Sequence, residues 1–137
     1  MNRLDFCTLM ERAKIASGIS ISEISFSMKM LMPTLRRFEK GEHNFSLIKV
    51  MEYLRVLHAQ LVIYNEKSSV TITEYNQLIA WVVSARKDCY TQRSLAEAIG
   101  ISYVMLARVE SQKSSLSIDV LLKIIEVLEY KIDIKLL

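Results

Sequence analysis

The stretch TQRSLAEAIGISYVMLARVE, residues 91–110, decides the fold of this chain. Its apolar spacing predicts one helix over about residues 91–99 and a second over about 102–111. Gly100 lies between them, where glycine accepts the positive φ of a tight turn at little cost. Ser102 is a good N-cap for the second helix. Such a short break indicates either a bend within a helical bundle or a second helix that is held out to contact a partner.

The chain also contains an internal repeat. When the sequence is shifted by 71 residues without a gap, identical and apolar residues coincide. The identical pairs are Leu35/Leu106, Arg37/Arg108, Glu39/Glu110, Ser46/Ser117, Val56/Val127, Leu57/Leu128 and Ile63/Ile134. Apolar positions without identity follow the same spacing, as in Ile24 with Leu95 and Phe38 with Val109. We therefore predict two copies of one unit.

Each unit is predicted to contain four short helices and a terminal strand. In the second unit the first helix runs from near Thr73, as its N-cap, to about Lys87. The fourth helix runs from the N-cap Ser117 to about Glu129. The tail YKIDIKLL, residues 130–137, alternates apolar and polar residues as a strand does.

The first unit repeats this order and ends in AQLVIYN, residues 59–65. A single strand cannot satisfy its own backbone, so the two terminal strands are expected to pair with each other or with a second chain. The predicted fold is all-α with minor β, with domains at residues 1–66 and 73–137 joined by a linker at 67–72. A short hairpin is the alternative conformation of that linker.

Composition limits the class of protein. Apolar residues make up 51% of the chain, with only 3 Gly and 1 Pro, which indicates a compact helical protein. The net charge of +3 comes from residues 1–70, which hold 10 Lys/Arg against 7 Asp/Glu, whereas residues 71–137 hold 8 of each. Attraction to polyanions should therefore lie mostly in the first half.

Neither a membrane segment nor a disulfide framework is expected. No apolar run approaches the roughly 18 residues that span a bilayer, and charged residues occupy the N-terminus where a signal peptide would need an apolar core. Cys7 and Cys89 form no CxxC pair, which favours a reducing, cytoplasmic location and predicts that both thiols are buried as small apolar groups.

Enzymatic chemistry has no basis in this sequence. It contains no Gly-rich phosphate loop, nucleophile elbow or His–carboxylate set. His43 and His58 lack Cys or Asp partners at metal-ligand spacing, so surface positions are expected for both. We expect no enzyme activity, no cofactor and no metal site.

Residues 91–110 resemble the helix-turn-helix of the lambda-repressor-like (Cro/XRE) family. The residues that carry the resemblance are Gln92, Leu95, Ala96, Gly100, Ser102, Leu106 and Glu110. In the first unit LRRFEKGEHNFS, residues 35–46, is similar to the end of the third helix in this family, with Gly41 as the left-handed residue that follows it. The first unit departs from the pattern at Ile21, Lys29 and Leu31, which replace the Gln, the turn Gly and the capping hydroxyl.

The resemblance implies which residues contact DNA, because the third helix of such domains lies in the major groove. The base-facing candidates are Met32, Pro33, Thr34 and Arg37 in the first unit and Tyr103, Val104, Met105 and Arg108, after the cap Ser102, in the second. The phosphate-facing candidates are Arg36, Lys40 and His43 in the first unit and Gln92, Arg93 and Lys113 in the second. Backbone N–H groups of the helix that starts at Ser46 are expected to add donors.

The resemblance also implies a structural role for Glu39 and Glu110, each paired with a basic residue of the first helix. Lys14 is the candidate in the first unit. The second unit has Ala85 at the matching position, with Arg86 beside it as a substitute.

Two other interpretations of these residues stay open. Arg36 and Arg37 can form a solvated helix face, and Met32, Tyr103 and Met105 can be buried or face a protein.

The predicted function is sequence-specific binding of double-stranded DNA by a bacterial or phage transcriptional regulator. Two linked units can imitate the homodimer that such repressors form, or one unit can bind DNA while the other makes a homodimer or binds a protein partner. The alternative is a protein-interaction module, of the antitoxin-like or mobile-element accessory kind, whose third helices bind a protein instead of DNA.

Overall fold

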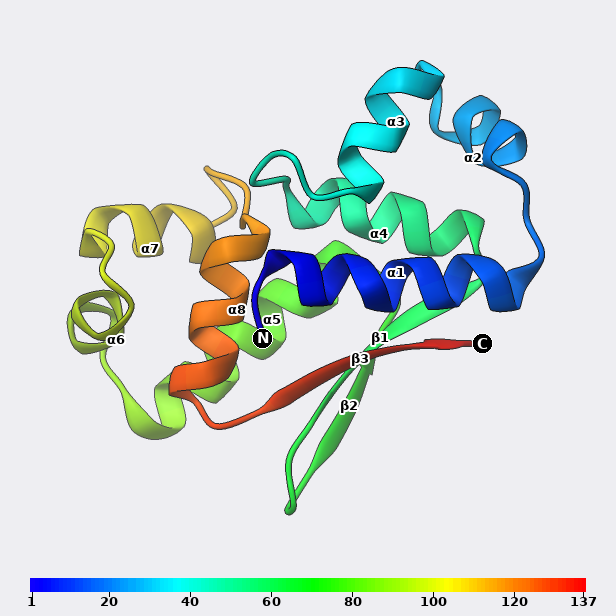
Figure 1. Cartoon of the computed structure of the whole chain (residues 1–137). Helices are drawn as coiled ribbons and strands as arrows, with labels where there is room; N and C mark the ends of the chain where they lie inside the picture. Colours follow the sequence, from blue (N-terminus) through cyan, green and yellow to red (C-terminus); the bar gives the residue numbers. More distant parts are fainter.

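A computed structural model describes all 137 residues as eight helices and three strands (Figure 1). The helices are α1 (Arg3–Ser17), α2 (Ile21–Met28), α3 (Met32–Glu39), α4 (Leu47–Val56), α5 (Tyr75–Cys89), α6 (Gln92–Ile99), α7 (Tyr103–Glu110) and α8 (Ile118–Val127). The strands are β1 (Ala59–Tyr64), β2 (Ser69–Ile72) and β3 (Lys131–Leu136). The predicted all-α fold with minor β is confirmed.

The backbone repeats with the period found in the sequence. The bounds of α2, α3 and α4 coincide, 71 residues later, with those of α6, α7 and α8. Left-handed residues recur at the same distance in three pairs: Lys29 with Gly100, Gly41 with Gln112, and His58 with Glu129. The first helices differ, since α1 ends at a left-handed Gly18 whereas α5 extends to Cys89 and is followed by an extended Tyr90.

The three strands form one antiparallel sheet in the order β2-β1-β3. The expected pairing of the two terminal strands is therefore found within one chain. Residues 67–72 contribute β2, which pairs with β1 as a hairpin whose turn is closed by Asn65. The Asn65 side-chain oxygen accepts from the backbone N–H groups of Lys67 at 2.8 Å and Ser68 at 2.9 Å.

One hydrophobic core contains buried residues of both halves, from Phe6 of α1 to Ile134 of β3. The halves also meet where α4 and α8 begin. There Ser46 faces Ser117 in an isolated antiparallel bridge. The Leu47 N–H donates to the Leu116 carbonyl at 2.8 Å, and the Ile118 N–H donates to the Phe45 carbonyl at 2.9 Å.

Three expectations about local structure are wrong. The N-cap of α5 is Glu74, whose capping box with Gln77 displaces the predicted Thr73. Cys89 is exposed because it ends α5, whereas Cys7 is buried as predicted. The start of α4 offers few donors to a phosphate: besides the Leu47 N–H, which bonds across to the other half, the Ile48 N–H is satisfied by the Ser46 hydroxyl at 3.1 Å.

Candidate nucleic-acid interface

The α6–α7 pair has a tight turn that the sequence defines locally. The Thr91 hydroxyl caps α6 by accepting from the Ser94 N–H at 3.0 Å. Gly100 adopts φ +78° and ends α6 in the left-handed conformation. The Ser102 hydroxyl then caps α7 by accepting from the Met105 N–H at 3.1 Å. Inside this turn the side chains of Leu95, Ala96 and Leu106 are buried, so α7 is fixed by its inner face.

The opposite face of α7 is open to solvent. Val104 is 55% exposed, Met105 44% and Tyr103 40%. The interpretation that Tyr103 and Met105 are buried is therefore wrong. The Arg93 guanidinium lies over the Tyr103 ring, 4.1 Å from its centroid, as a cation–π contact. This contact links the start of α6 to the start of α7 and holds one cation beside the exposed apolar residues.

Arg108 is also exposed, but its guanidinium has partners in the chain. Its Nε donates to the Ser114 hydroxyl at 3.1 Å, and its Nη2 donates to the Lys113 carbonyl at 3.3 Å. Both partners lie in the loop between α7 and α8. The guanidinium is therefore held at the end of α7, and it must leave or share these bonds to grip a base.

A buried ion pair fixes the end of α7 against α5. The Arg86 guanidinium donates to both carboxylate oxygens of Glu110, at 2.6 and 2.8 Å, and Arg86 is only 7% exposed. Gln92 donates to the same carboxylate at 3.0 Å. The expected pairing of Glu110 with Arg86 is confirmed, and Gln92 is occupied in part by this structural contact.

The α2–α3 pair has the same backbone with less favourable residues. Lys29 adopts φ +55° at the turn, and Leu31 begins α3 without a side-chain cap, as the sequence predicted. Pro33 lies in the first turn of α3, where its missing N–H costs nothing. The Ser25 hydroxyl donates to the Met30 carbonyl across the turn, and this bond compensates in part for the missing glycine and the missing cap.

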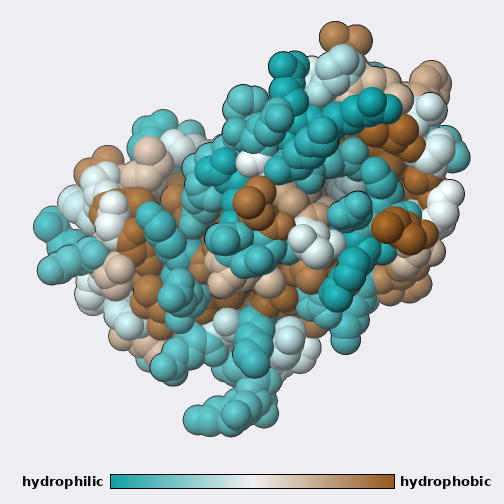
Figure 2. Space-filling view, viewed as in Figure 1, coloured by the Kyte–Doolittle hydropathy of each residue, from teal (hydrophilic) through white to brown (hydrophobic).

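The outer face of α3 is polar and cationic. Pro33, Thr34, Arg36, Arg37 and Lys40 are all exposed, and Met32 is half-buried. Hydrophilic side chains cover most of the surface over α3, whereas hydrophobic ones are mixed with them over α7 (Figure 2). No hydrogen bond or ion pair engages the Arg37 guanidinium, in contrast to that of Arg108.

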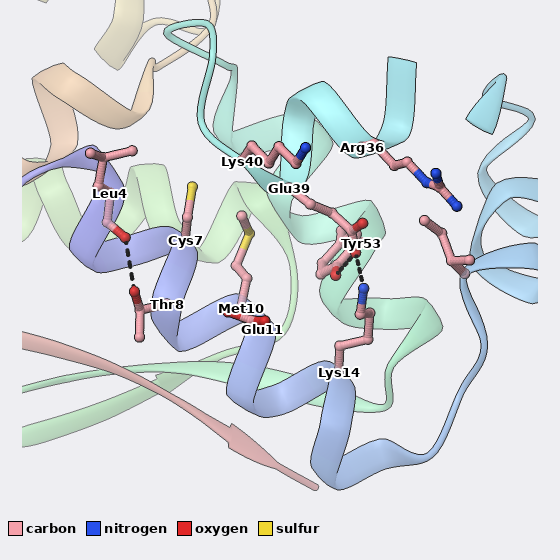
Figure 3. Close-up of a pocket in the computed structure, with 11 residues that line it drawn as sticks. Leu4, Cys7, Thr8, Met10, Glu11, Lys14, Arg36, Glu39, Lys40 and Tyr53 are labelled. Carbon is pink, nitrogen blue, oxygen red and sulfur yellow. Dashed lines mark hydrogen bonds and ion pairs between the residues drawn. The ribbon is translucent and has the colours of Figure 1, made fainter. Parts of the chain in front are cut away.

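Glu39 anchors the end of α3 through a different set of partners. Lys14 of α1 donates to its carboxylate at 3.0 Å, which confirms the expected pair. The Tyr53 hydroxyl of α4 donates to the same oxygen at 2.6 Å. Figure 3 shows Lys14 and Tyr53 converging on Glu39, at one side of a shallow hollow between α1 and α3, while Arg36 points away from this cluster.

Burial, together with the bond to the Glu39 carboxylate, raises the pKa of the Tyr53 hydroxyl well above its usual value. Sequence reasoning missed Tyr53, because the matching residue of the second half is the apolar Ile124 and the position reads as core.

Residues 86–135 match a family model described as Helix-turn-helix. The matched segment begins within α5 and ends within β3, so it contains α6, α7 and α8. Residues 1–85 lie outside it. No curated protein and no solved structure matches the chain.

The helix-turn-helix segment brings together most of the residues predicted for the second half. Arg93, Ser102, Tyr103, Val104, Met105 and Arg108 lie along α6 and α7, and Lys113 follows in the next loop. All of these are exposed, and Gln92 is half-buried. No group of three or more His, Cys, Asp or Glu side chains is placed to hold a metal ion, and no helix is long and apolar enough to cross a membrane.

Proposed function

We propose that this protein is a sequence-specific DNA-binding transcriptional regulator that inserts α7 into the major groove. The observation that carries the proposal is the helix-turn-helix match over residues 86–135, on a pair of helices whose second member is anchored by one face and open on the other. A helix presented in this way can reach base edges with its first residues.

The exposed side chains of α7 suit a mixed readout. Val104 and Met105 can contact thymine methyl groups, since apolar side chains read that group in the major groove. Arg108 can grip the two acceptors of guanine. Arg93 and Lys113, at the two ends of the segment, can neutralise phosphates and so set the register of the helix.

We also propose that the first half is a second helix-turn-helix unit of the same kind. The bounds of α2, α3 and α4 coincide with those of α6, α7 and α8 after a shift of 71 residues. Glu39 at the end of α3 is anchored to α1, as Glu110 at the end of α7 is anchored to α5. Arg36, Arg37 and Lys40 give it the stronger positive charge, and Pro33 and Thr34 begin its exposed face.

Selection from a random duplex pool, followed by sequencing of the bound fraction, tests the proposal. An enriched motif supports sequence-specific binding. The affinity for that motif should fall with rising salt, with a slope of about −0.9 per phosphate contacted on a logarithmic plot. A folded protein that enriches no sequence and retains no duplex at low salt would overturn the proposal.

A protein-interaction module is the second candidate, and one observation favours it. Phe26 is 86% exposed and Leu31 is 77% exposed, where the matching residues of the second half are the polar Glu97 and Ser102. Exposed apolar groups of this size are common at protein interfaces. Binding through them would change little with salt, so the salt dependence of any complex separates the two functions.

A further inference from the structure

The two halves meet through pairs of equivalent residues. Ser46 faces Ser117, and Val62 of β1 faces Asp133 of β3; in each pair the second residue is the first one shifted by 71 positions. A residue lies opposite its own equivalent only at a two-fold axis. Two such points, at the starts of α4 and α8 and in the middle of the sheet, define an approximate two-fold axis through the chain.

The contacts on either side of these points are exchanged as a two-fold axis requires. In the sheet Leu61 pairs with Ile134, and its equivalent Ile132 pairs with Ile63. At the other point the N–H of Leu47 bonds to the second half, and the N–H of its equivalent Ile118 bonds back to the first. The halves are therefore joined as the subunits of an isologous dimer are joined.

This axis places the two exposed helices symmetrically. In Figure 1, α3 and α7 lie on opposite sides of the α3–α4 and α7–α8 loops, and both lie away from the β1–β2 hairpin. A dimeric helix-turn-helix protein presents its two recognition helices in this way, each to one half-site, with the half-sites inverted about the same axis.

The surfaces that the axis relates are not alike. The exposed positions of α3 include Thr34, Arg36 and Arg37, and the matching positions of α7 are Met105, Ala107 and Arg108. Arg37 is free of intramolecular bonds, whereas Arg108 is held by Ser114 and Lys113. Because Thr34 and Arg36 of α3 are polar where Met105 and Ala107 of α7 are apolar, we expect the two helices to prefer different bases.

We propose that one chain alone binds a duplex with two unlike, inverted half-sites. The α3 half-site contains guanine read by Arg37, and the α7 half-site contains thymines whose methyl groups contact Val104 and Met105. The centres of the half-sites lie about 10 base pairs apart, one helical turn. This inference rests on the proposed function and specifies its DNA ligand. A second copy is not needed, because the terminal strands already pair within the chain.

The test uses the full chain and the duplex found by selection. Four duplexes are compared. They are the selected duplex, two palindromes that each repeat one of its half-sites, and the selected duplex with about 5 base pairs inserted at its centre. We expect native mass spectrometry to give one chain per selected duplex. Each palindrome, and the inserted duplex, should bind at least about tenfold more weakly, because one helix then meets wrong bases or the opposite side of the DNA.

Two variants assign the half-sites. Arg37→Ala should relax base preference only in the α3 half-site, and Met105→Ala only in the α7 half-site. Both residues are exposed, so neither change should unfold the chain.

Specific binding by two chains on a palindrome would overturn the inference but leave the proposed function standing. So would specific binding to a single half-site that ignores the insertion. Absence of binding to every duplex would overturn the proposed function itself.

Discussion

The α2–α3 and α6–α7 pairs have the same helix bounds but reach them with different side chains. The second pair has a glycine in the left-handed position and a hydroxyl at the cap of its last helix, whereas the first has Lys29 and Leu31. Each replacement costs about 1 kcal/mol. Buried residues such as Leu35 and Leu106 offset more than this, so packing maintains the turn where local preference is lost.

The largest difference between the two pairs lies in the carboxylates that anchor α3 and α7, because the cationic partner of Glu110 is more deeply buried than that of Glu39. Their substitution gives the largest expected effect. Glu110→Gln leaves the guanidinium of Arg86, which is 7% exposed, without its counter-ion. We expect a loss of about 3 kcal/mol in the free energy of unfolding, measured by urea denaturation, because an unpaired buried charge is costly. Glu39→Gln is the matched change. Lys14 is 26% exposed and can turn to water, so about 1 kcal/mol is expected. Equal losses would show that burial does not separate the two pairs.

The next comparison concerns DNA affinity. Arg37→Ala should weaken binding to the selected duplex by about 1–3 kcal/mol and relax specificity at one base pair, since its guanidinium is free to engage a base. Arg108→Ala should cost less, because the wild-type side chain must first give up its bonds to Ser114 and Lys113. Quantitative gel-shift titration measures both. The control is Lys67→Ala, which removes one charge from the hairpin turn; if it weakens binding as much as Arg37→Ala, then Arg37 contributes only overall charge.

Tyr53 has no polar counterpart in the second half, where Ile124 takes its place. Tyr53→Phe removes one bond to the Glu39 carboxylate and should cost about 1.5 kcal/mol near neutral pH. Because the folded state raises the pKa of Tyr53, its contribution is complete below the unfolded pKa of about 10 and is lost as pH rises above it.

Urea denaturation between about pH 8 and 11 measures this loss. The phenylalanine variant should show a weaker alkaline decline than the wild type, whereas Tyr64→Phe, at an exposed position, should show the same decline as the wild type. A variant of Tyr53 with an unchanged decline would contradict the raised pKa.

Lys29 and Gly100, the left-handed residues of the two turns, give a smaller effect, and their substitutions should change stability in opposite directions. Lys29→Gly should stabilise the chain by about 1 kcal/mol, and Gly100→Ala should destabilise it by a similar amount. A Cβ on Gly100 would meet no atom within 4 Å, so the second cost is conformational rather than steric. Thermal unfolding of the two variants measures the opposite shifts. A change of the same sign in both would mean that the two turns do not share one conformation.

The same turns show what the sequence predicts and what it does not. Caps and left-handed positions follow from a few neighbouring residues, so the bounds of α6, α7 and α8 lay within one or two residues of their predicted positions. The bridge between Ser46 and Ser117 joins residues that are distant in sequence, and so does the bond from Tyr53 to Glu39. Serine also caps helices and tyrosine also packs in cores, so the residue type alone does not indicate either contact. No spacing rule identifies such contacts, because they depend on how the two halves pack.

Of the two ion pairs between the halves, Arg3–Asp119 and Arg12–Asp133, the first should give the smallest of the predicted effects. Arg3 of α1 donates through Nε to Asp119 of α8 at 3.0 Å, and this bond holds the pKa of the Asp119 carboxyl below its usual value. A lowered folded pKa contributes stability above the unfolded pKa of about 4, and that stability is lost as pH falls through the folded value. Asp119→Asn should therefore lower the urea midpoint slightly at pH 7, and the difference from the wild type should shrink below about pH 4. Both side chains are partly exposed, at 27% and 35%, so added salt should reduce the difference as well. A difference that persists at low pH would assign Asp119 a role in capping α8 instead of a role in pairing with Arg3.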